Sequence, residues 1–400
     1  MPTQTSSIFR WLMLSLVCSV LLVACETEPT GQDGTLEGET ETPSAVAASP
    51  VAPGGAEATP SLTPSQLAAR FFVQGTDKVI YLVSQNGGRI RIGEGDFQSP
   101  IESTLPSNPV TDGRAFLLTV QGPAESKAYA VGQDGAQALN FIQGAIQELA
   151  VWPGNGSEPA RLAWDGYNVV PGSTDLHSQI VVSNTDGSDQ QVLIEETGQE
   201  RILVVGRWSA DGKRLYYSKE PLGLGGYILF GGASDLWVYD FESGESRQLF
   251  SDKLGAICID DLSRDETHIA EHCALDVQGV VDLNSGDIGT IATPAGLGEK
   301  VVVGGARFDP ASQRLAYAMA LNNPEAEQGW AGISDSLDGS SDLLAEAPLG
   351  EYFRIATWLN EDLIVLQSEG ATPGIWTIRV DGSDLKHISD GTFLGVEENP

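Results

Sequence analysis

Seven glycine-containing turns recur along this chain at intervals that fit one structural repeat. The glycines are Gly87, Gly135, Gly187, Gly244, Gly286, Gly339 and Gly382, and the intervals are 48, 52, 57, 42, 53 and 43 residues. Short strand-like runs lie between the turns, and helical periodicity is nearly absent after residue 70. A period of about 40 to 55 residues with four strands is typical of a β-propeller. We therefore predict an all-β fold with a single β-propeller, most simply of seven four-stranded blades. Six or eight blades also fit, because the turn at Gly339 is the weakest.

The clearest copy of the repeat runs from Trp208 to Leu249. It contains Trp-Ser-Ala-Asp-Gly-Lys at 208–213, Leu-Trp-Val-Tyr-Asp at 236–240 and Arg-Gln-Leu at 247–249. Further first turns stand at 109–114, 308–317 and 358–363, and further second turns at 181–188 and 375–383. This pattern resembles the TolB-type, WD40-like repeat (PD40), in which W-S-P-D-G-K is followed by three more strands. The resemblance covers nearly all of the folded part and implies a TolB-like β-propeller over residues 67–400.

The first blade, around Arg70 to Gly95, is one strand short. The C-terminal segment Thr392–Val396 has strand character and no other partner in the repeat. We predict that it completes the first blade, because joining the two ends of the chain would remove exposed strand edges.

The N-terminus contains an almost uninterrupted apolar run, Ile8 to Ala24, with one basic residue, Arg10, near its start. A basic residue, an apolar stretch and a small residue before a cut site are typical of a secretory signal. The ending Leu-Val-Ala-Cys at 22–25 resembles the lipobox of bacterial lipoproteins. This resemblance implies that residues 1–24 are a signal peptide, that Cys25 is lipidated, and that the lipid anchors the protein to a membrane. The alternative is an uncleaved transmembrane anchor, for which a run of about 17 residues is at the short limit.

Residues 25–66 are predicted to be the lipidated cysteine and a disordered tether. From Glu26 to Gln66 the chain holds seven acidic residues, no Lys or Arg, and almost no large apolar residue. Such a segment cannot bury enough apolar surface to offset the entropy lost on ordering. The whole chain has a net charge of −33, which argues against nucleic acid as a partner.

Two cysteines remain after Cys18 and Cys25, namely Cys258 and Cys273. They lie symmetrically about the turn at 263–266, so they are expected to face each other across an antiparallel hairpin. Export would place them in an oxidising compartment, and facing residues come within disulfide range. We predict a structural disulfide between them; two reduced thiols are the alternative.

The loops between second and third strands carry long insertions, the sharpest of which is Leu222–Gly232. This stretch is apolar, aromatic and flanked by glycines where an exposed loop is expected. Exposed apolar patches often mark partner sites. The alternatives are a plug over the central channel and an extra hairpin. The candidate partner-binding residues are Leu222, Leu224, Tyr227, Ile228, Leu229 and Phe230.

Motifs for catalysis and metal binding are not found. The chain has no G-x-S-x-G elbow, no H-E-x-x-H and no phosphate loop, and its four histidines are scattered. The Asp-Gly-Ser-Asp runs at 186–189 and 381–384 lack the ligand count of a calcium loop, and aspartates cap such turns. Most tryptophans match repeat positions, which favours packing between blades over carbohydrate stacking. No cofactor, metal ligand or catalytic residue is therefore assigned.

These features favour an extracytoplasmic, lipid-anchored propeller of the bacterial cell envelope. TolB works through protein contacts, so the resemblance implies a non-enzymatic binding or scaffold module for an envelope protein or polymer. This chain has a lipobox and a tether where TolB has an α/β domain, so TolB's own partners are not transferred. The alternative is an envelope hydrolase acting on glycan or lactone at the channel, which predicts converging acids there.

Overall fold

The computed structural model describes residues 69–398, apart from 104, 120–125, 199–200, 222–228, 252–256, 275, 298–300, 322–327, 336, 338 and 371. The predicted signal peptide, Cys25 and the predicted tether lie outside the described residues, so these assignments and the boundary at residue 67 stay predictions. In the described part, no helix has the length and apolar character needed to cross a membrane.

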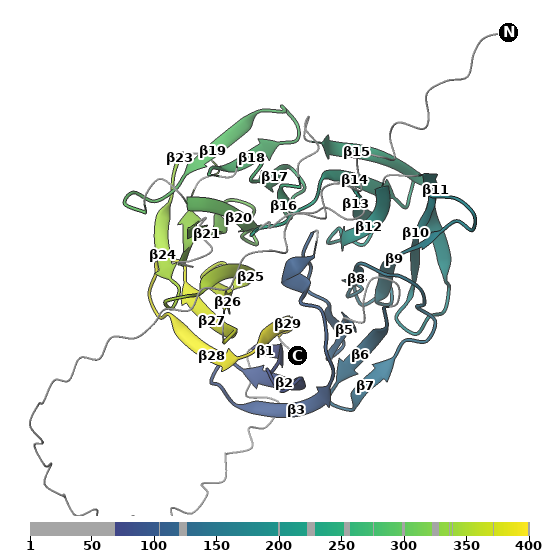
Figure 1. The fold of residues 1–400 in the computed structure, drawn as a ribbon, viewed down its shortest axis with the longest axis horizontal. Coiled ribbons are helices and arrows are strands. Elements are labelled where there is room, and N and C mark those ends of the chain that lie inside the picture. Colours follow the sequence, from purple (N-terminus) through teal and green to yellow (C-terminus); the bar gives the residue numbers. More distant parts are fainter. Residues whose placement is uncertain are drawn as a thin grey trace, which may run out of the picture. The chain divides into compact units, whose positions relative to one another are not determined.

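The described residues form seven small sheets arranged in a ring around a central axis (Figure 1). Within each sheet the strands follow one another from the axis outward. All neighbouring strands are antiparallel, apart from one short parallel pair in the fifth blade. The prediction of an all-β, seven-bladed propeller is therefore confirmed, and the alternatives of six or eight blades are excluded.

Each of the first four blades contains four strands, named below from the innermost to the outermost. Blade 1 contains β29 (Thr392–Glu398), β1 (Ala69–Gln74), β2 (Val79–Ser84) and β3 (Arg89–Glu94). Blade 2 contains β4 (Val110–Thr111), β5 (Arg114–Leu118), β6 (Ala128–Gly132) and β7 (Gly135–Ala138). Blade 3 contains β8 (Leu149–Trp152), β9 (Arg161–Val169), β10 (Leu176–Asn184) and β11 (Gln191–Gly198). Blade 4 contains β12 (Arg201–Trp208), β13 (Arg214–Pro221), β14 (Asp235–Asp240) and β15 (Glu245–Ser251).

The last three blades include one irregular sheet. Blade 5 contains β16 (Ile259–Leu262), β17 (His268–Glu271), β18 (Gln278–Asp282), β19 (Ile288–Ala292) and β23 (Gly339–Ser340). Blade 6 contains β20 (Val301–Phe308), β21 (Leu315–Leu321), β22 (Gly329–Ser334) and β24 (Asp342–Glu346). Blade 7 contains β25 (Tyr352–Asn360), β26 (Leu363–Glu369), β27 (Gly374–Arg379) and β28 (Lys386–Asp390). The short β23 leaves the blade 6 turn to pair in parallel with β19, which explains why the turn at Gly339 is the weakest copy.

All seven repeat glycines stand where the sequence places them, at or beside the turn between the third and fourth strands of a blade. Each has a positive φ, between 71° and 103°. Glycine adopts this conformation without the steric cost that a Cβ would impose. The repeat is therefore set by backbone geometry at one turn of each blade.

The ring is closed by the C-terminal strand. β29 pairs antiparallel with β1, with Phe71 opposite Val396 and Phe72 opposite Gly395. Phe393 and Val396 are buried in an apolar cluster between blades 7 and 1. The predicted completion of the first blade is confirmed, and β1 is paired along both of its edges, with β29 and with β2.

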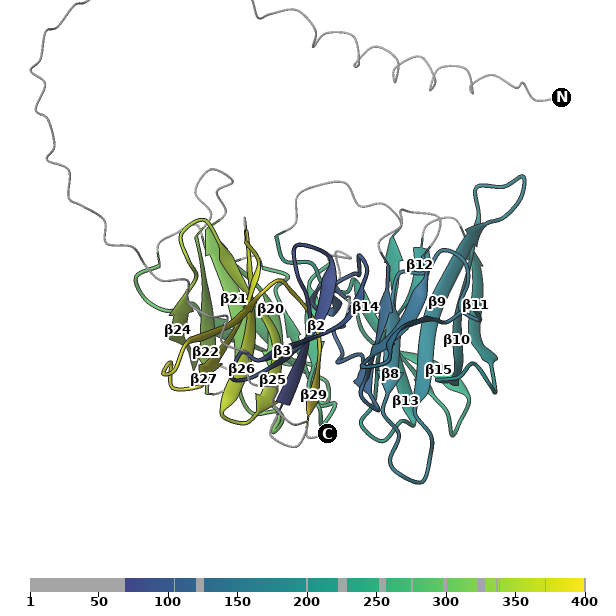
Figure 2. The same ribbon diagram turned by 90° about the horizontal axis from the view of Figure 1, so that it is seen from below.

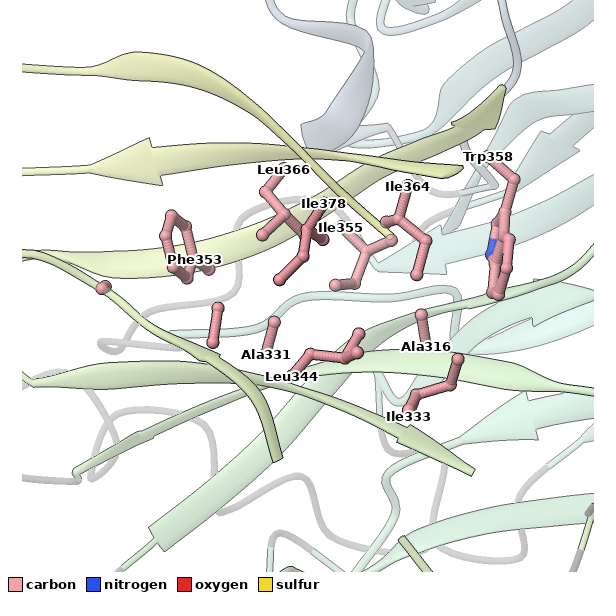
Figure 3. Packing of buried hydrophobic residues seen from close by; sticks show 12 residues of the cluster. Ala316, Ala331, Ile333, Leu344, Phe353, Ile355, Trp358, Ile364, Leu366 and Ile378 are labelled. Carbon is pink, nitrogen blue, oxygen red and sulfur yellow. The ribbon is translucent and has the colours of Figure 1, made fainter. Parts of the chain in front are cut away.

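Apolar side chains fill the space between neighbouring blades. Between blades 6 and 7, Ile355, Ile364 and Leu366 face Ala316 and Ala331 of the adjacent sheet (Figure 3). Small residues on one blade allow the larger side chains of the next to interdigitate, as close packing requires.

The two faces of the ring differ. In Figure 2 the loop between β9 and β10 rises from one face, and the C-terminal end of β29 lies at the other. The long insertions between second and third strands belong to the first face, here called the long-loop face. The short turns after the inner strands belong to the second, here called the short-turn face.

We expect the F393A substitution to lower the free energy of unfolding by about 3 to 5 kcal/mol, because it removes a buried aromatic side chain at the closure. Urea unfolding followed by tryptophan fluorescence measures the change. The matched control is L385A, at an exposed turn position, which should cost less than about 0.5 kcal/mol. Equal effects of the two substitutions would contradict a closure that depends on packing by β29.

Candidate functional site

A segment that the sequence did not single out crosses the central channel. After β3 the chain forms the 3-10 turn η2 (Pro100–Glu102), which lies near the centre of the ring (Figure 1). Ile101 packs with Phe393 of blade 1, whereas Leu105 is buried with Tyr216 of blade 4. Residues 98–103 and 105–109 therefore lie between blades 1 and 4 near the centre of the ring, where a plug by Leu222–Gly232 was considered.

A cavity of about 380 Å³ lies beside this segment at the short-turn face. Five inner strands supply its walls at their carboxyl ends. Each contributes a large apolar residue and the residue before it: Val151 and Trp152, Arg207 and Trp208, Asp261 and Leu262, Arg307 and Phe308, and Thr357 and Trp358. Equivalent positions of blades 3 to 7 thus converge around the axis.

A β-bulge lies next to the polar wall position in four of these strands. The pairing register shifts between Val205 and Trp208 in β12, and between Gly304 and Arg307 in β20. Corresponding shifts occur in β16 and β25. A bulge bends the strand and re-aims a side chain, so these bulges turn the residue before the apolar one toward the channel.

Arg207 and Asp261 form an ion pair between blades 4 and 5. Arg207 Nη1 donates to Asp261 Oδ1 at 2.9 Å, and its other Nη donates to the carbonyls of Leu262 and Ser263. Asp261 Oδ2 accepts from the backbone N–H of Phe308 in blade 6, at 2.9 Å. The carboxylate of Asp261 therefore joins three successive blades.

The second carboxylate at the cavity, Glu266, is also engaged. It forms an ion pair with Arg214 and a hydrogen bond with the hydroxyl of Tyr216. Burial, the hydrogen bond and the negative charge of Glu266 together raise the pKa of Tyr216, so the phenol stays protonated.

Arg307 is charged, buried and incompletely bonded. Its side chain is 7% exposed. Nη1 donates to the carbonyls of Asp260 and Ala306, at 3.0 and 2.6 Å, and Nε has no hydrogen-bond partner. Burial lowers the pKa of Arg307, and Asp261 and Asp260 oppose that effect.

The tryptophans at the cavity hold blades together. Trp152 Nε1 donates to the carbonyl of Ala210, and Trp208 Nε1 donates to that of Ala150, which links blades 3 and 4 in both directions. The Arg161 guanidinium lies 4.6 Å and 4.9 Å from the centres of these two rings. Because both indoles are buried, the prediction of packing between blades is confirmed for these two tryptophans.

The described end of the candidate partner-binding loop lies inside the propeller. Phe230 is 3% exposed and packs beside Ala318 and Ala320 of blade 6. A Cβ at Gly304 would lie 2.5 Å from Phe230 Cβ. Leu229 is partly buried, and its carbonyl accepts from Arg354 Nη2 at 2.9 Å. Phe230 thus anchors the loop and is not part of an exposed patch.

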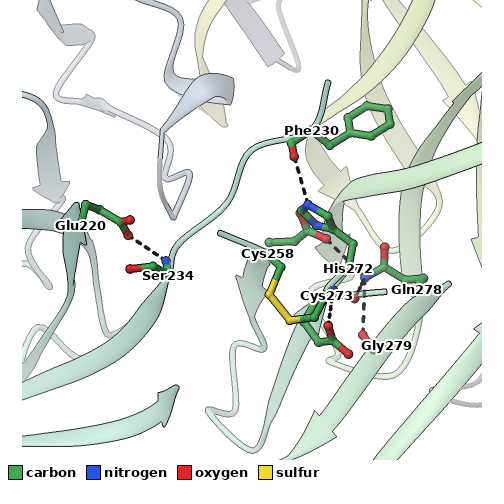
Figure 4. The surroundings of a disulfide bond; sticks show 10 residues. Glu220, Phe230, Ser234, Cys258, His272, Cys273, Gln278 and Gly279 are labelled. Carbon is green, nitrogen blue, oxygen red and sulfur yellow. Dashed lines mark hydrogen bonds and ion pairs between the residues drawn. A yellow bond between two sulfur atoms is a disulfide. The ribbon is translucent and has the colours of Figure 1, made fainter. Parts of the chain in front are cut away.

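The other four predicted loop residues, Leu222, Leu224, Tyr227 and Ile228, lie outside the described residues. Their contact with a partner stays a prediction. The base of the loop is closed on both sides, since Glu220 accepts from the N–H of Ser234 at 2.9 Å and Ala233 pairs with Ile259 (Figure 4).

His272 connects the loop to blade 5. It is 1% exposed, with Nδ1 3.0 Å from Asp260 Oδ1 and Nε2 3.0 Å from the carbonyl oxygen of Phe230 (Figure 4). A carbonyl accepts only, and a carboxylate accepts when ionised, so both ring nitrogens donate and the ring is an imidazolium. Burial lowers the pKa of His272, but attraction to Asp260 and the two hydrogen bonds outweigh burial and raise it above 6.5.

The disulfide between Cys258 and Cys273 is present, with Cα atoms 4.9 Å apart (Figure 4). The predicted register is wrong by one residue. A bulge at Asp260 shifts the β16–β17 pairing, so that Ile259 faces Glu271 and the carbonyl of Cys258 accepts from the N–H of His272. The cysteines therefore bond diagonally, beside the histidine that anchors the loop.

The structure supports the turn-capping interpretation of the Asp-Gly-Ser-Asp runs. Asp186 Oδ1 accepts from the N–H and the hydroxyl of Ser188, and Asp381 does the same with Ser383. In the described residues, one group of side chains has metal-ligand proximity, namely Cys258, Glu271 and Cys273. Its two sulfur atoms are bonded to each other.

The sequence did not reveal the cavity or the segment that lies in the channel. One feature of the sequence could have indicated the cavity. Two copies of the repeat carry an arginine before the aromatic residue, Arg-Trp at 207–208 and Arg-Phe at 307–308. The segment 98–109 carries no repeat pattern, so only the closed ring shows where it lies.

No protein-family model and no curated protein matches this chain, whereas solved structures do. A prolyl endopeptidase matches at 12% identity and a TM-score of 0.54, over 85% of this chain and 50% of that one. This chain thus spans about half the length of the peptidase.

A putative TolB from Agrobacterium tumefaciens matches at 12% identity and a TM-score of 0.38, over 82% of this chain and 90% of that one. A periplasmic gluconolactonase of Pseudomonas aeruginosa matches at 13% identity and a TM-score of 0.45, over 82% and 98%. At these identities the likeness concerns the fold alone.

We expect H272Q to destabilise the protein in a pH-dependent way. Below the unfolded pKa of about 6.5 the imidazolium stabilises the fold fully, and the loss of the buried pair should cost about 3 to 5 kcal/mol. As the pH rises through the raised folded pKa of His272, this stabilisation is lost, so the difference between wild type and variant should shrink.

Urea unfolding at a series of pH values measures that difference. H387Q is the control, because His387 is exposed on an outer strand and its loss should cost less than about 0.5 kcal/mol. A difference between wild type and H272Q that grows with pH would overturn the assignment of an imidazolium.

Proposed function

We propose that this protein is a lipid-anchored, extracytoplasmic β-propeller that binds a protein or polymer of the cell envelope and catalyses no reaction. Three features support this proposal: the lipobox-like ending at Cys25, the disulfide in blade 5, and the state of the carboxylates at the central cavity. The third carries the choice between binding and hydrolysis.

Both carboxylates at the cavity are already engaged. Asp261 accepts from Arg207 and from a backbone N–H of the next blade, and Glu266 binds Arg214 and Tyr216. Hydrolysis of a glycoside needs one carboxyl group that donates a proton and a second that acts as nucleophile or base. Both carboxylates are paired with arginines and neither is a protonated group placed to donate, so the cavity favours binding over hydrolysis.

Acids with raised pKa values lie elsewhere in the described part of the chain. Burial raises the pKa of Asp165 to about 7, although the N–H groups of Gln147, Val205 and Glu148 lower it. Burial also raises the pKa of Glu220, which accepts hydrogen bonds at the base of the loop. Neither side chain lines the cavity, and both join parts of the fold.

The long-loop face is the proposed partner surface. The residues that flank 222–228 are held in place, since Glu220 accepts from Ser234 and Phe230 is bonded to His272. A variable loop on a rigid scaffold is a common arrangement for binding. The apolar character of Leu222, Leu224, Tyr227 and Ile228 suits a protein partner.

The disulfide supports a location outside the cytoplasm, because such bonds persist in oxidising compartments. The 41 residues between Cys25 and the predicted start of the propeller would hold the domain on the order of 35 Å from the lipid.

We expect C25S to release the protein from the membrane fraction and to abolish labelling by radioactive palmitate, because the acyl chains provide the anchor. Fractionation of cells with a carbonate wash measures the release. The matched control is C18S, inside the predicted signal peptide, which should leave both properties unchanged. A C25S variant that stays in the washed membranes would contradict lipid anchoring at this residue.

We expect replacement of residues 222–228 by an equally long Gly-Ser segment to remove the partner. Leu229 and Phe230 are kept because they pack into the propeller. The measurement is affinity purification from detergent-solubilised envelopes, with identification of the co-purified proteins.

The matched control replaces residues 170–175 of the β9–β10 loop on the same face. A partner lost only with the first replacement supports the proposal. If no partner accompanies either the wild type or the variants, the loop proposal fails and an envelope hydrolase becomes the better hypothesis.

A further inference from the structure

We propose that the cavity at the short-turn face binds a small organic ligand through a carboxylate group, which pairs with Arg307 and Arg264. This site is distinct from the partner surface on the long-loop face, and the inference does not depend on that partner.

The cavity is positive in a strongly negative protein. Three arginines line it, Arg207, Arg264 and Arg307, together with two carboxylates, Asp261 and Glu266. Glu266 is neutralised by Arg214, which lies outside the lining residues. The net charge of the whole chain is −33. A pocket with more arginines than acids is therefore unexpected from the composition, and it indicates a binding site for an anion.

Asp261 pairs with Arg207 and lies near Arg307, but its oxygens already accept hydrogen bonds from other groups. Asp261 Oδ1 accepts from Arg207 and from the N–H of Leu262, and Oδ2 accepts from the N–H of Phe308. Arg307 donates to two backbone carbonyls and to no carboxylate. A buried cation without a hydrogen-bonded counter-ion is costly, and an anionic ligand would relieve that cost.

Asp260, the other acid close to Arg307, is also committed. Its Oδ1 accepts from His272 at 3.0 Å and from the N–H of Gly305 at 2.8 Å, and its Oδ2 lies 3.3 Å from the amide of Gln278. The Nε of Arg307 has no hydrogen-bond partner and is itself buried. A ligand would therefore meet the other part of the guanidinium, since Arg307 lines the cavity.

The chemistry of the walls indicates an organic anion. A guanidinium presents a planar fork that matches a carboxylate with two parallel hydrogen bonds. Ser107, Ser209 and Thr357 add hydroxyl groups, and Ile101, Leu262 and Phe308 add apolar surface. A volume of about 380 Å³ is near the lower end for ligand pockets, which fits a short peptide terminus or an acidic monosaccharide.

The experiment is isothermal titration calorimetry on the full-length mature protein in detergent. The probes are glucuronate against glucose, trialanine against its C-terminal amide, and inorganic phosphate. We expect one carboxylate probe to bind, and its neutral counterpart to bind at least about tenfold more weakly. The two pairs of probes distinguish an acidic sugar from a peptide terminus.

Variants locate the site. R264Q changes an exposed residue at the cavity and should weaken binding several-fold without lowering the melting temperature. R307Q should abolish binding, and R264Q keeps the test decisive if R307Q fails to fold. The matched control is R247Q, an exposed arginine on the outer strand β15, which should bind as the wild type does.

Three results would overturn the proposal. The first is binding of neither carboxylate probe, and the second is equal binding of the charged and neutral members of a pair. The third is binding that R264Q leaves unchanged. Binding of phosphate alone would also reject the carboxylate and assign the cavity to an inorganic anion.

Discussion

The pairing of β29 with β1 is the interaction on which the rest of the structure depends. Every blade buries its apolar faces only against the blades on either side, so a ring left open would expose two of those faces to water. The closure brings residues 69–74 and 392–398 into one sheet, and Ser99, at the start of the segment across the channel, donates to the carbonyl of Phe393. The position of that segment, and of the cavity beside it, therefore depends on a contact between the two ends of the chain.

Polar side chains then fix each blade to the next. Asp165 accepts from the N–H of Val205, Asp261 from that of Phe308, and Gln367 from that of Phe393. In each case the acceptor lies on one blade and the donor on the inner strand of its neighbour. Bulges disturb regular pairing close to several of these donors, and buried N–H groups must find a partner. The same bulges that turn arginines toward the channel thus create the need for carboxylates between the blades.

The two faces of the ring carry different kinds of side chain as a result of the propeller fold. On the short-turn face, equivalent positions converge on one axis and concentrate arginines in a small volume. On the long-loop face, the described end of one insertion is held by a buried imidazolium next to a disulfide. A rigid base beneath a variable loop and a charged cavity on the opposite side suit two separate binding events, with the propeller as the common scaffold.

The sequence by itself determined the propeller, its seven turns, its closing strand and its disulfide, because these follow from local signals: glycines with positive φ, strand patterns and cysteines about a hairpin. It failed on the register at Cys258, because the bulge lies at Asp260, whose carboxylate accepts from Gly305 of blade 6, 45 residues away, and a contact of that range leaves no local signal. It also could not place Phe230 inside the fold or find the cavity. Those features arise where residues such as Arg207, Asp261 and Arg307, about 50 positions apart, meet around one axis, and only the closed ring brings them together.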